Sequence, residues 1–254
     1  MSGSTEVLME RSGGEAPVPR FELEEWRSTY GVVAGITGRA GAFDLGLTSS
    51  DPMRIVMDRW ITFLTCHNSG FSGVVVSIQP HGSAVGVHRS GWQGVTVASG
   101  LDGHATDVPG VLIGVTVADC IPVYLLHPDT GAVAVLHAGW KGIVAGILER
   151  GVEALSELAS AGVGELLMHC GVGICGTCYE VGPEVHQKVM GGVASTPGPL
   201  DLRAVLTDQA LALGLEHVTT SGWCSAHSDD RFYSHRASGG SAGRMLAYIG
   251  RPVT

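Results

Sequence analysis

The segment from Gly73 to Leu136 most constrains the fold, because it is a succession of short apolar runs rich in Val and Ile. Runs of this length, bounded by Gly, Pro, Ser or Asp, are typical of buried strands. We predict strands over 73–79, 84–88, 94–98, 111–117, 121–126 and 132–136. The Asp129-Thr130-Gly131 turn predicts that the last two form a hairpin. A chain with this centre is built around β-sheet.

The longest apolar reach, residues 108–126, is interrupted by Gly114, Asp119 and Pro122. A membrane span needs about 20 largely uninterrupted apolar residues, so we interpret this reach as two buried strands around a turn. Residues 1–20 hold Gly, Ser, Glu and two prolines without an apolar run, which is typical of a flexible tail and not of a signal peptide. We expect no membrane association and a cytoplasmic protein.

Helices are predicted on either side of the strand-rich centre. The first begins at Asp51-Pro52, where we expect the aspartate to cap the free amides, and ends near Asn68 and Gly70. Three more are predicted over 140–158, 183–190 and 202–213, and further strands over 31–37, 165–170, near 217 and over 244–249. Central strands with helices outside indicate an α+β fold. No linker divides the chain, so we predict one catalytic domain over 21–254.

Charge and cysteine content exclude several classes of function. The net charge is -9 with only 15 Lys and Arg among 254 residues, whereas nucleic-acid binding requires a concentrated basic surface. A small anionic ligand held by a few arginines remains compatible with this charge. Six cysteines in a chain of this length do not indicate a disulfide framework, so we expect reduced thiols, some of them metal ligands. Nothing in the sequence indicates a protein partner.

Three short phrases each place one metal-ligand residue beside small, turn-forming residues. They are Gln79-Pro80-His81-Gly82, Ala118-Asp119-Cys120-Ile121-Pro122 and His137-Ala138-Gly139-Trp140-Lys141-Gly142. A thiolate and two imidazoles suit zinc, and three protein ligands leave a fourth position open for water or substrate, which is the catalytic pattern. We therefore predict His81, Cys120 and His137 as ligands of zinc, with copper as an alternative.

These phrases, together with DGHAT, CYEVG and FYSHR…GRM, resemble the YfiH-type family, also called the laccase-domain or multicopper polyphenol oxidoreductase-like family. The resemblance runs from about Val33 to Ile249. It implies a four-layer α/β/β/α sandwich with mixed sheets. It also implies a zinc-dependent purine nucleoside phosphorylase, with accompanying adenosine deaminase and methylthioadenosine phosphorylase activities, that acts on small nucleosides and phosphate.

Carboxylates near the ligands are candidates for proton transfer. Asp119 lies inside an apolar stretch beside Cys120, and burying its charge requires a partner. Asp119 is therefore a candidate to orient a ligand histidine or to accept a proton, although a structural role that binds turn amides is equally compatible. Asp102 and Thr106 match the family's D-x-x-x-T phrase, from which no chemical role follows.

Four basic residues fall inside family-like phrases and are candidates to bind phosphate: Arg39, Lys141, Arg236 and Arg244. We expect Arg39 and Arg236 to be the most important. Lys141 stands where many relatives carry arginine, and Thr37-Gly38-Arg39-Ala40-Gly41 departs from the family's T-T-R-x-G-G. The start of the helix predicted near Trp140 also suits an anion.

Other functions remain open at this stage. A copper-dependent phenol oxidase uses histidines in H-x-H pairs, and the chain has none. A cysteine hydrolase would use Cys120 as nucleophile and His81 or His137 as base, and an amidase acting on cell-wall precursor peptides is one form of it. The lone Cys175-Gly176-Thr177-Cys178 motif favours a structural or substrate-facing loop over a redox pair. A protein that only stores or senses zinc is the non-enzymatic alternative.

Overall fold

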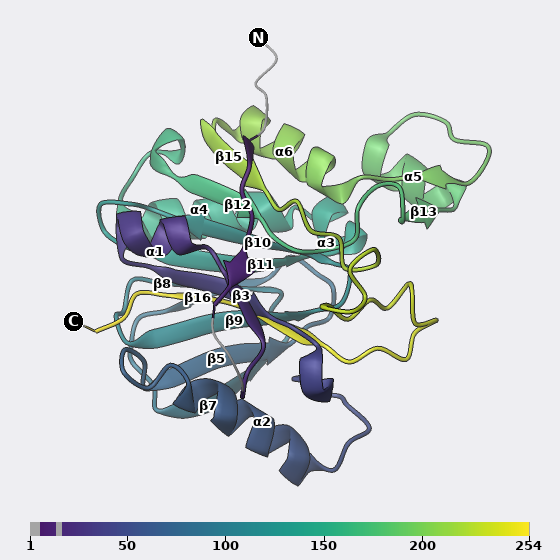
Figure 1. Ribbon diagram of the computed structural model, residues 1–254. Helices are drawn as coiled ribbons and strands as arrows, with labels where there is room; N and C mark the ends of the chain where they lie inside the picture. Colours follow the sequence, from purple (N-terminus) through teal and green to yellow (C-terminus); the bar gives the residue numbers. More distant parts are fainter. Residues whose placement is uncertain (1–5, 14–16, 254) are drawn as a thin grey trace.

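Two seven-stranded sheets form the centre of the protein, for which a computed structural model describes residues 6–13 and 17–253 (Figure 1). The first sheet has the order β1-β15-β12-β10-β11-β8-β6, and the second has the order β2-β3-β4-β16-β9-β5-β7. The strands of the first sheet are β1 (Glu6–Val7), β15 (His217–Thr220), β12 (Leu167–Cys170), β10 (Ile121–Leu126), β11 (Val133–Ala138), β8 (Gly103–Thr106) and β6 (Val85–His88). Those of the second are β2 (Arg11–Ser12), β3 (Arg20–Glu22), β4 (Val33–Thr37), β16 (Met245–Gly250), β9 (Val111–Val117), β5 (Gly73–Ile78) and β7 (Gly94–Ser99). Both sheets contain parallel and antiparallel pairs.

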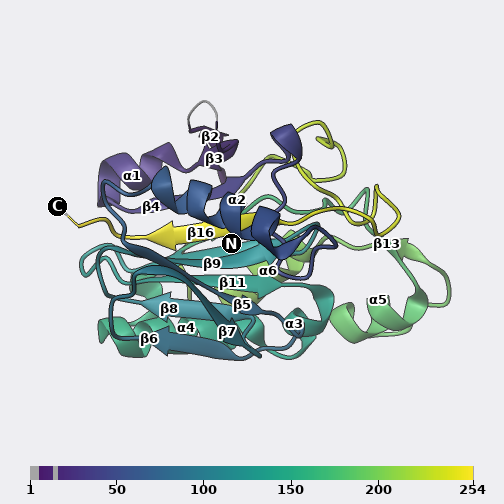
Figure 2. The same ribbon diagram turned by 90° about the horizontal axis from the view of Figure 1, so that it is seen from below.

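Helices cover the outer faces of this pair of sheets (Figures 1 and 2). On the second sheet lies α2 (Met53–Thr65), whose Trp60 and Phe63 are fully buried against strand residues. On the first sheet lie α4 (Ile147–Ala159) and α6 (Leu202–Leu213). A third apolar cluster fills the space between the sheets. This arrangement confirms the predicted α+β fold with four α/β/β/α layers.

The link between β9 and β10 crosses from one sheet to the other. The 108–126 reach does form two buried strands, but β9 pairs with β16 in the second sheet whereas β10 pairs with β11 in the first. The β10–β11 hairpin is antiparallel, as predicted, and its register places Pro122 opposite His137. Residues 118–120 therefore lie where the ends of both sheets meet.

The helix predicted over 140–158 is broken in two. It consists of α3 (Trp140–Val144) and α4, and Gly146 between them has a φ of +82°. A left-handed residue of this kind ends a helix, and glycine adopts it without steric cost. The helix whose start was expected to bind an anion near Trp140 is thus only five residues long.

The capping role predicted for Asp51 is wrong. Helix α2 begins at Met53 with Pro52 at its N-cap and has no side-chain cap. The Asp51 carboxylate instead accepts a hydrogen bond from the guanidinium of Arg59, a residue of α2, at 2.6 Å. An ion pair with a half-buried arginine stabilises the same helix by another route.

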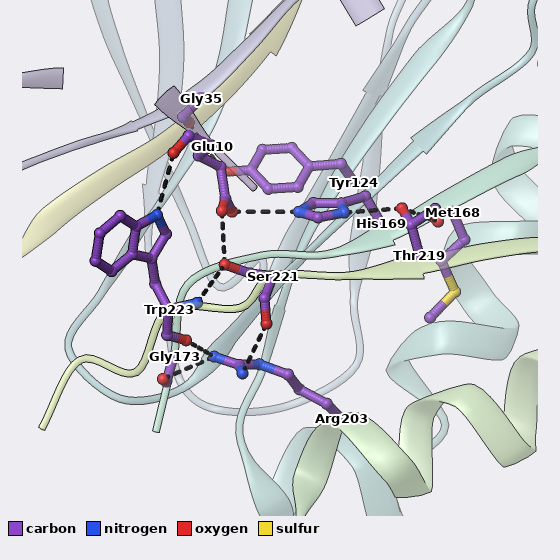
Figure 3. A network of polar contacts seen from close by, with 10 residues as sticks. All are labelled: Glu10, Gly35, Tyr124, Met168, His169, Gly173, Arg203, Thr219, Ser221 and Trp223. Carbon is purple, nitrogen blue, oxygen red and sulfur yellow. Dashed lines mark hydrogen bonds and ion pairs between the residues drawn. The ribbon is translucent and has the colours of Figure 1, made fainter. Parts of the chain in front are cut away.

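The segment predicted as a flexible tail, residues 1–20, lies against both sheets in its described parts; residues 1–5 and 14–16 lie outside the described residues. β1 extends the first sheet and β2 extends the second. Between them Glu10 is buried, and its carboxylate contacts His169 Nε2 at 3.2 Å and accepts a hydrogen bond from Ser221 Oγ at 2.6 Å (Figure 3). A buried carboxylate is tolerated only with such partners, so Glu10 fixes this segment in place.

Besides β1, β2 and β3, several short elements were not predicted from the sequence. They are α1 (Glu24–Tyr30), the 3-10 turns η1 (Ala40–Ala42) and η2 (Val163–Glu165), β8, and the small β13 (Glu180–Val181) and β14 (Gly198–Pro199) pair beside α5 (Pro183–Met190). Of these, β8 matters most for the site, because Asp102 directly precedes it and it pairs with β11. Among the described residues, no helix is long and apolar enough to cross a membrane.

Candidate active site

His81, Cys120 and His137 meet where three strands end. His81 follows β5, Cys120 lies in the link between β9 and β10, and His137 is near the end of β11. One side-chain ligand atom from each lies within 4.8 Å of the others, and the two imidazole ring centroids are 4.7 Å apart. The fold thus brings together the three residues predicted as ligands from distant parts of the sequence, and their role as ligands stays a prediction.

The backbone at His81 is held in an unusual conformation by Asp102. His81 has a φ of +63°, which costs a residue with a Cβ about 1–3 kcal/mol unless the surroundings favour it. The Asp102 carboxylate supplies such surroundings, because it accepts hydrogen bonds from the amides of His81 at 3.0 Å and Gly82 at 2.6 Å. The turn that carries His81 is therefore anchored to a fully buried carboxylate.

Asp102 also orients His137. Its Oδ1 accepts a hydrogen bond from His137 Nδ1 at 2.9 Å, while its backbone carbonyl accepts one from the His137 amide at 2.7 Å. A histidine whose Nδ1–H is bonded to a carboxylate has its Nε2 lone pair free to bind a metal. Burial raises the pKa of Asp102, but its hydrogen bonds with His137, Gly82 and His81 outweigh this and lower the pKa.

The thiol of Cys120 and the imidazole of His137 favour opposite charges on each other. Burial raises the pKa of Cys120, but the neighbouring His137 and His81 outweigh burial and lower the pKa to about 6. Burial lowers the pKa of His137, but the Cys120 thiolate and the bond to Asp102 outweigh it and raise the pKa to about 9. The site therefore favours the thiolate, which is both the metal-binding and the nucleophilic form of cysteine.

Two cavities open onto these residues. The larger has a volume of about 390 Å³, and the smaller one of about 240 Å³. The larger is lined by Gly46, Leu47, Thr48, Ser77, Ile78, Gln79, His81, Thr116, Ala118, Cys120, His137, His235 and Arg244. The smaller is lined by His81, Asp119, Cys120, Gly139, Trp140, Lys141, Ile174, Tyr179 and Leu202. Because both include His81 and Cys120, a molecule in either cavity reaches the candidate metal site.

The structure gives Asp119 a different environment from the one expected of an acid–base group. Its Oδ1 accepts a hydrogen bond from Ser225 Oγ at 2.6 Å, and its Oδ2 accepts one from the Arg236 amide at 2.7 Å. Both carboxylate oxygens thus hold the 225–236 segment against the β9–β10 link. The orientation of a ligand histidine, which we considered for Asp119, is performed by Asp102.

The four predicted phosphate-binding residues do not gather at one place. Arg244 lines the larger cavity and Lys141 the smaller. Arg236 donates to the Glu180 carbonyl at 2.8 Å and lies over Tyr179, a residue of the smaller cavity's wall. Arg39 lines neither cavity, since its guanidinium donates to the Asp229 carbonyl and lies over Tyr233. Arg244 and Lys141 are therefore better placed than Arg39 to meet a ligand at the candidate metal site.

Sequence reasoning missed two contributors to this site. Asp102 was noticed only as part of a phrase, and its distance from the ligands along the chain hid its role. His235 lines the larger cavity and lies inside the FYSHR phrase, so the phrase itself was the available signal. Among the described residues a second group that could hold a metal ion consists of Cys175, Cys178, Cys224 and His227.

Comparison with known proteins identifies related sequences. A family model described as "Multi-copper polyphenol oxidoreductase laccase" matches residues 29–252. The chain is 30% identical over 208 residues to purine nucleoside phosphorylase YlmD of Geobacillus stearothermophilus, which covers 77% of this chain and 73% of the relative. It is 36% identical over 186 residues to a purine nucleoside phosphorylase of Deinococcus radiodurans, covering 68% of each. It is 29% identical over 248 residues to adenosine deaminase RL5 of an unknown prokaryotic organism, covering 90% of this chain and 94% of the relative.

The fold is shared as well. The crystal structure of YlmD from Geobacillus stearothermophilus superposes with a TM-score of 0.84 at 25% identity, covering 95% of this chain and 99% of that chain. The common architecture thus extends over nearly the whole molecule, including both sheets that carry the candidate ligands.

Proposed function

Because this chain belongs to the multi-copper polyphenol oxidoreductase laccase family, whose named relatives include purine nucleoside phosphorylases, we propose that it is a metal-dependent purine nucleoside phosphorylase. Its substrates would be adenosine, inosine or guanosine and inorganic phosphate, and its products the free base and ribose 1-phosphate. The observation that carries the proposal is the meeting of His81, Cys120 and His137 at a cavity that Arg244 also lines. A volume of about 390 Å³ is in the range that holds a small organic ligand.

The donor atoms fit zinc. His137 is oriented through Nδ1 by Asp102, Cys120 favours the thiolate, and His81 is exposed enough to leave a coordination position accessible. Two nitrogens and one sulfur with an open fourth position are typical of catalytic zinc. Copper binds the same donors, so the identity of the metal is the finer part of this proposal. A bound zinc ion would supply Lewis acidity beside His81 and Cys120, which line both cavities.

Phosphorolysis forms a bond between a phosphate oxygen and the sugar C1′ as the bond from C1′ to the base nitrogen breaks. The phosphate needs a cationic partner, which is Arg244 if the phosphate lies in the larger cavity and Lys141 if it lies in the smaller one. The departing base carries the electron pair of the broken bond and needs a proton. On the lining of the larger cavity, His235 is the titratable side chain besides Arg244 and the three candidate ligands, so we assign proton delivery to it.

An accompanying adenosine deaminase activity is included because the relative RL5 is named for it. Zinc deaminases of the cytidine type carry a glutamate two residues after a ligand histidine, whereas His137 is followed by Ala138 and Gly139. Deamination here would use another proton acceptor. We propose a cytoplasmic location, because all six cysteines are free and a thiolate ligand is preserved under reducing conditions.

A cysteine hydrolase is the second candidate, and one observation favours it. Cys120, His137 and Asp102 stand in the order of a nucleophile, a base and a carboxylate that orients the base. Such an enzyme, for example an amidase acting on cell-wall precursor peptides, would release no sugar phosphate and would not need metal.

Turnover of inosine and adenosine with and without phosphate separates these functions. We expect base release that depends on phosphate, disappears when the metal is removed by a chelator, and is absent in Cys120→Ala. Cys66→Ser is the matched control, because Cys66 is a free thiol outside the site, and its activity should equal that of the wild type. Full activity of metal-stripped protein on an amide substrate, with no nucleoside cleavage, would instead establish the cysteine hydrolase. Phenol oxidation that requires copper would establish the laccase alternative.

A further inference from the structure

A second group of metal-ligating residues lies outside the candidate active site. It combines Cys175-x-x-Cys178 with Cys224-x-x-His227, two motifs that are about fifty residues apart in sequence. One ligand atom from each of the four residues lies within 4.8 Å of the others. We propose that these residues form a structural zinc site of the Cys3His type. The inference does not depend on the proposed function.

The distances suit a tetrahedral ion. With Zn–S bonds of about 2.3 Å and Zn–N bonds of about 2.0–2.1 Å, tetrahedral ligand atoms lie roughly 3.3–3.8 Å apart. Cys178 Sγ is 3.1 Å from His227 Nε2, and Cys175 Sγ is 3.7 Å from His227 Nδ1. The imidazole thus has one nitrogen near each thiol of the C-x-x-C turn, and one of these two nitrogens would bind the ion together with the three sulfurs.

The surrounding backbone supports thiolate ligands. The Cys175 amide donates a hydrogen bond to Cys224 Sγ at 3.3 Å, which stabilises negative charge on that sulfur. The amides of Cys178 and Tyr179 both donate to the Cys175 carbonyl at 3.1 Å, forming a tight turn that points both of its thiols the same way. Such preorganised donors lower the cost of gathering three thiolates in one place.

The burial of the four residues and their number favour a bound metal ion over a redox pair. Cys224 is buried, Cys175 and Cys178 are half-buried, and His227 is exposed, so an ion has access from solvent. Four protein ligands close the coordination shell, which is the structural pattern, in contrast to the three ligands of the active site. The C-x-x-C motif is lone in the local sequence because its two partners are remote; the fold supplies them.

The position of this cluster indicates what the ion would stabilise. Ile174 and Tyr179, which flank the C-x-x-C turn, form part of the smaller cavity's wall. Ser225, next to Cys224, donates to the Asp119 carboxylate beside Cys120. Zinc at the cluster would therefore join the two loops that border the smaller cavity.

Another contact already joins the same two loops. The buried Arg203 guanidinium donates to the Gly173 carbonyl at 2.9 Å and the Trp223 carbonyl at 2.5 Å (Figure 3). Gly173 lies two residues before Cys175, and Trp223 lies directly before Cys224. Two links, one by Arg203 and one by zinc, would keep the wall of the smaller cavity rigid.

Zinc content of purified, reduced protein tests the site in a background that removes an active-site ligand. In Cys120→Ala we expect one zinc ion per chain, and none after Cys175→Ser and Cys178→Ser are added. Cys66→Ser in the same background is the matched control and should keep the ion. The proposal is overturned if Cys120→Ala binds no zinc from zinc-supplemented growth, or if its zinc survives the loss of both thiols.

A spectroscopic measurement covers the case in which the double serine variant does not fold. Cobalt substituted into Cys120→Ala should give the intense absorption of tetrahedral Co²⁺ with thiolate ligands, and His227→Cys should retain it. A spectrum without thiolate-to-cobalt charge transfer would contradict the proposal. So would an intact mass showing a Cys175–Cys178 disulfide in protein purified with reductant.

Discussion

Replacement of Asp102 by asparagine should weaken metal binding, although Asp102 is not itself one of the candidate metal ligands. The carboxylate accepts three hydrogen bonds, from His137 Nδ1, the His81 amide and the Gly82 amide. Asparagine has the same shape but only one accepting oxygen. Its amide group must face either the Gly82 amide or the pair formed by His81 and His137, so at least one donor loses its partner.

The size of the effect follows from these contacts. Hydrogen bonds to a charged group contribute about 1.5–3 kcal/mol each, so the loss of one corresponds to about 10–100-fold in an equilibrium constant. Changes in groups that orient metal ligands typically cost about the same factor in metal affinity. We therefore expect Asp102→Asn to bind zinc at the active site about 10–100-fold more weakly than the wild type.

Competition against a chromophoric chelator measures this affinity. Cys175→Ser with Cys178→Ser provides a background from which the second cluster is removed. Asp119→Asn is the matched control, since Asp119 also accepts two short hydrogen bonds, but from Ser225 and the Arg236 amide. It should lower thermal stability and leave zinc affinity unchanged. Equal zinc affinity in Asp102→Asn and the wild type, or equal loss in both variants, would refute the role assigned to Asp102.

Three further predictions follow from the same structure. Gly139 has a φ of -82°, which alanine accepts, but Gly139→Ala would place a Cβ 2.9 Å from Cys120 Sγ. We expect this substitution to lower the free energy of unfolding by about 1–3 kcal/mol and to reduce the metal content, as measured by thermal melting and zinc analysis. Arg244→Ala should raise the KM for phosphate by about tenfold or more, because a charge-assisted contact is lost, whereas Arg39→Ala should leave it unchanged in steady-state kinetics. Burial and a neighbouring histidine lower the pKa of His104 to about 3, so between about pH 6.5 and 3 the unfolded chain binds a proton that the folded chain does not. Stability should fall by about 1.4 kcal/mol for each pH unit in this window on account of that group, and chemical denaturation of His104→Gln should show a correspondingly flatter dependence on pH.

The longer strands were predictable from local sequence, but their assignment to sheets was not. The bounds predicted for 111–117 and 121–126 match β9 and β10, because each is an apolar run closed by turn residues. That these neighbours belong to different sheets depends on pairing with β16 and β11, which no local pattern encodes.

The structure of segments held by remote polar contacts could not be predicted either, because those contacts leave no local pattern in the sequence. Residues 6–12 contain only a short apolar run, Val7 to Met9, and lack apolar periodicity, which is typical of a tail. They are ordered because Glu10 meets His169 and Ser221, both more than 150 residues away (Figure 3). The break before α4 was readable in principle, since Gly146 has the conformational freedom that ends a helix.

The part of the candidate site that lies within recognisable sequence motifs was predictable. Family-like phrases identified His81, Cys120 and His137, which the fold brings together. The carboxylate that orients them was sought at Asp119, the nearest in sequence, whereas the nearest in space is Asp102. Cys224 and His227 escaped notice because their partners lie on another loop.

Metal add-back to stripped protein tests whether the protein is a metal-dependent nucleoside phosphorylase, with ribose 1-phosphate released from inosine as the measured product. We expect no product from the stripped protein with phosphate present. Product formation should return on addition of zinc, and His137→Ala should stay inactive under the same conditions. Equal rates before and after zinc addition, or hypoxanthine released without ribose 1-phosphate, would contradict the proposed function.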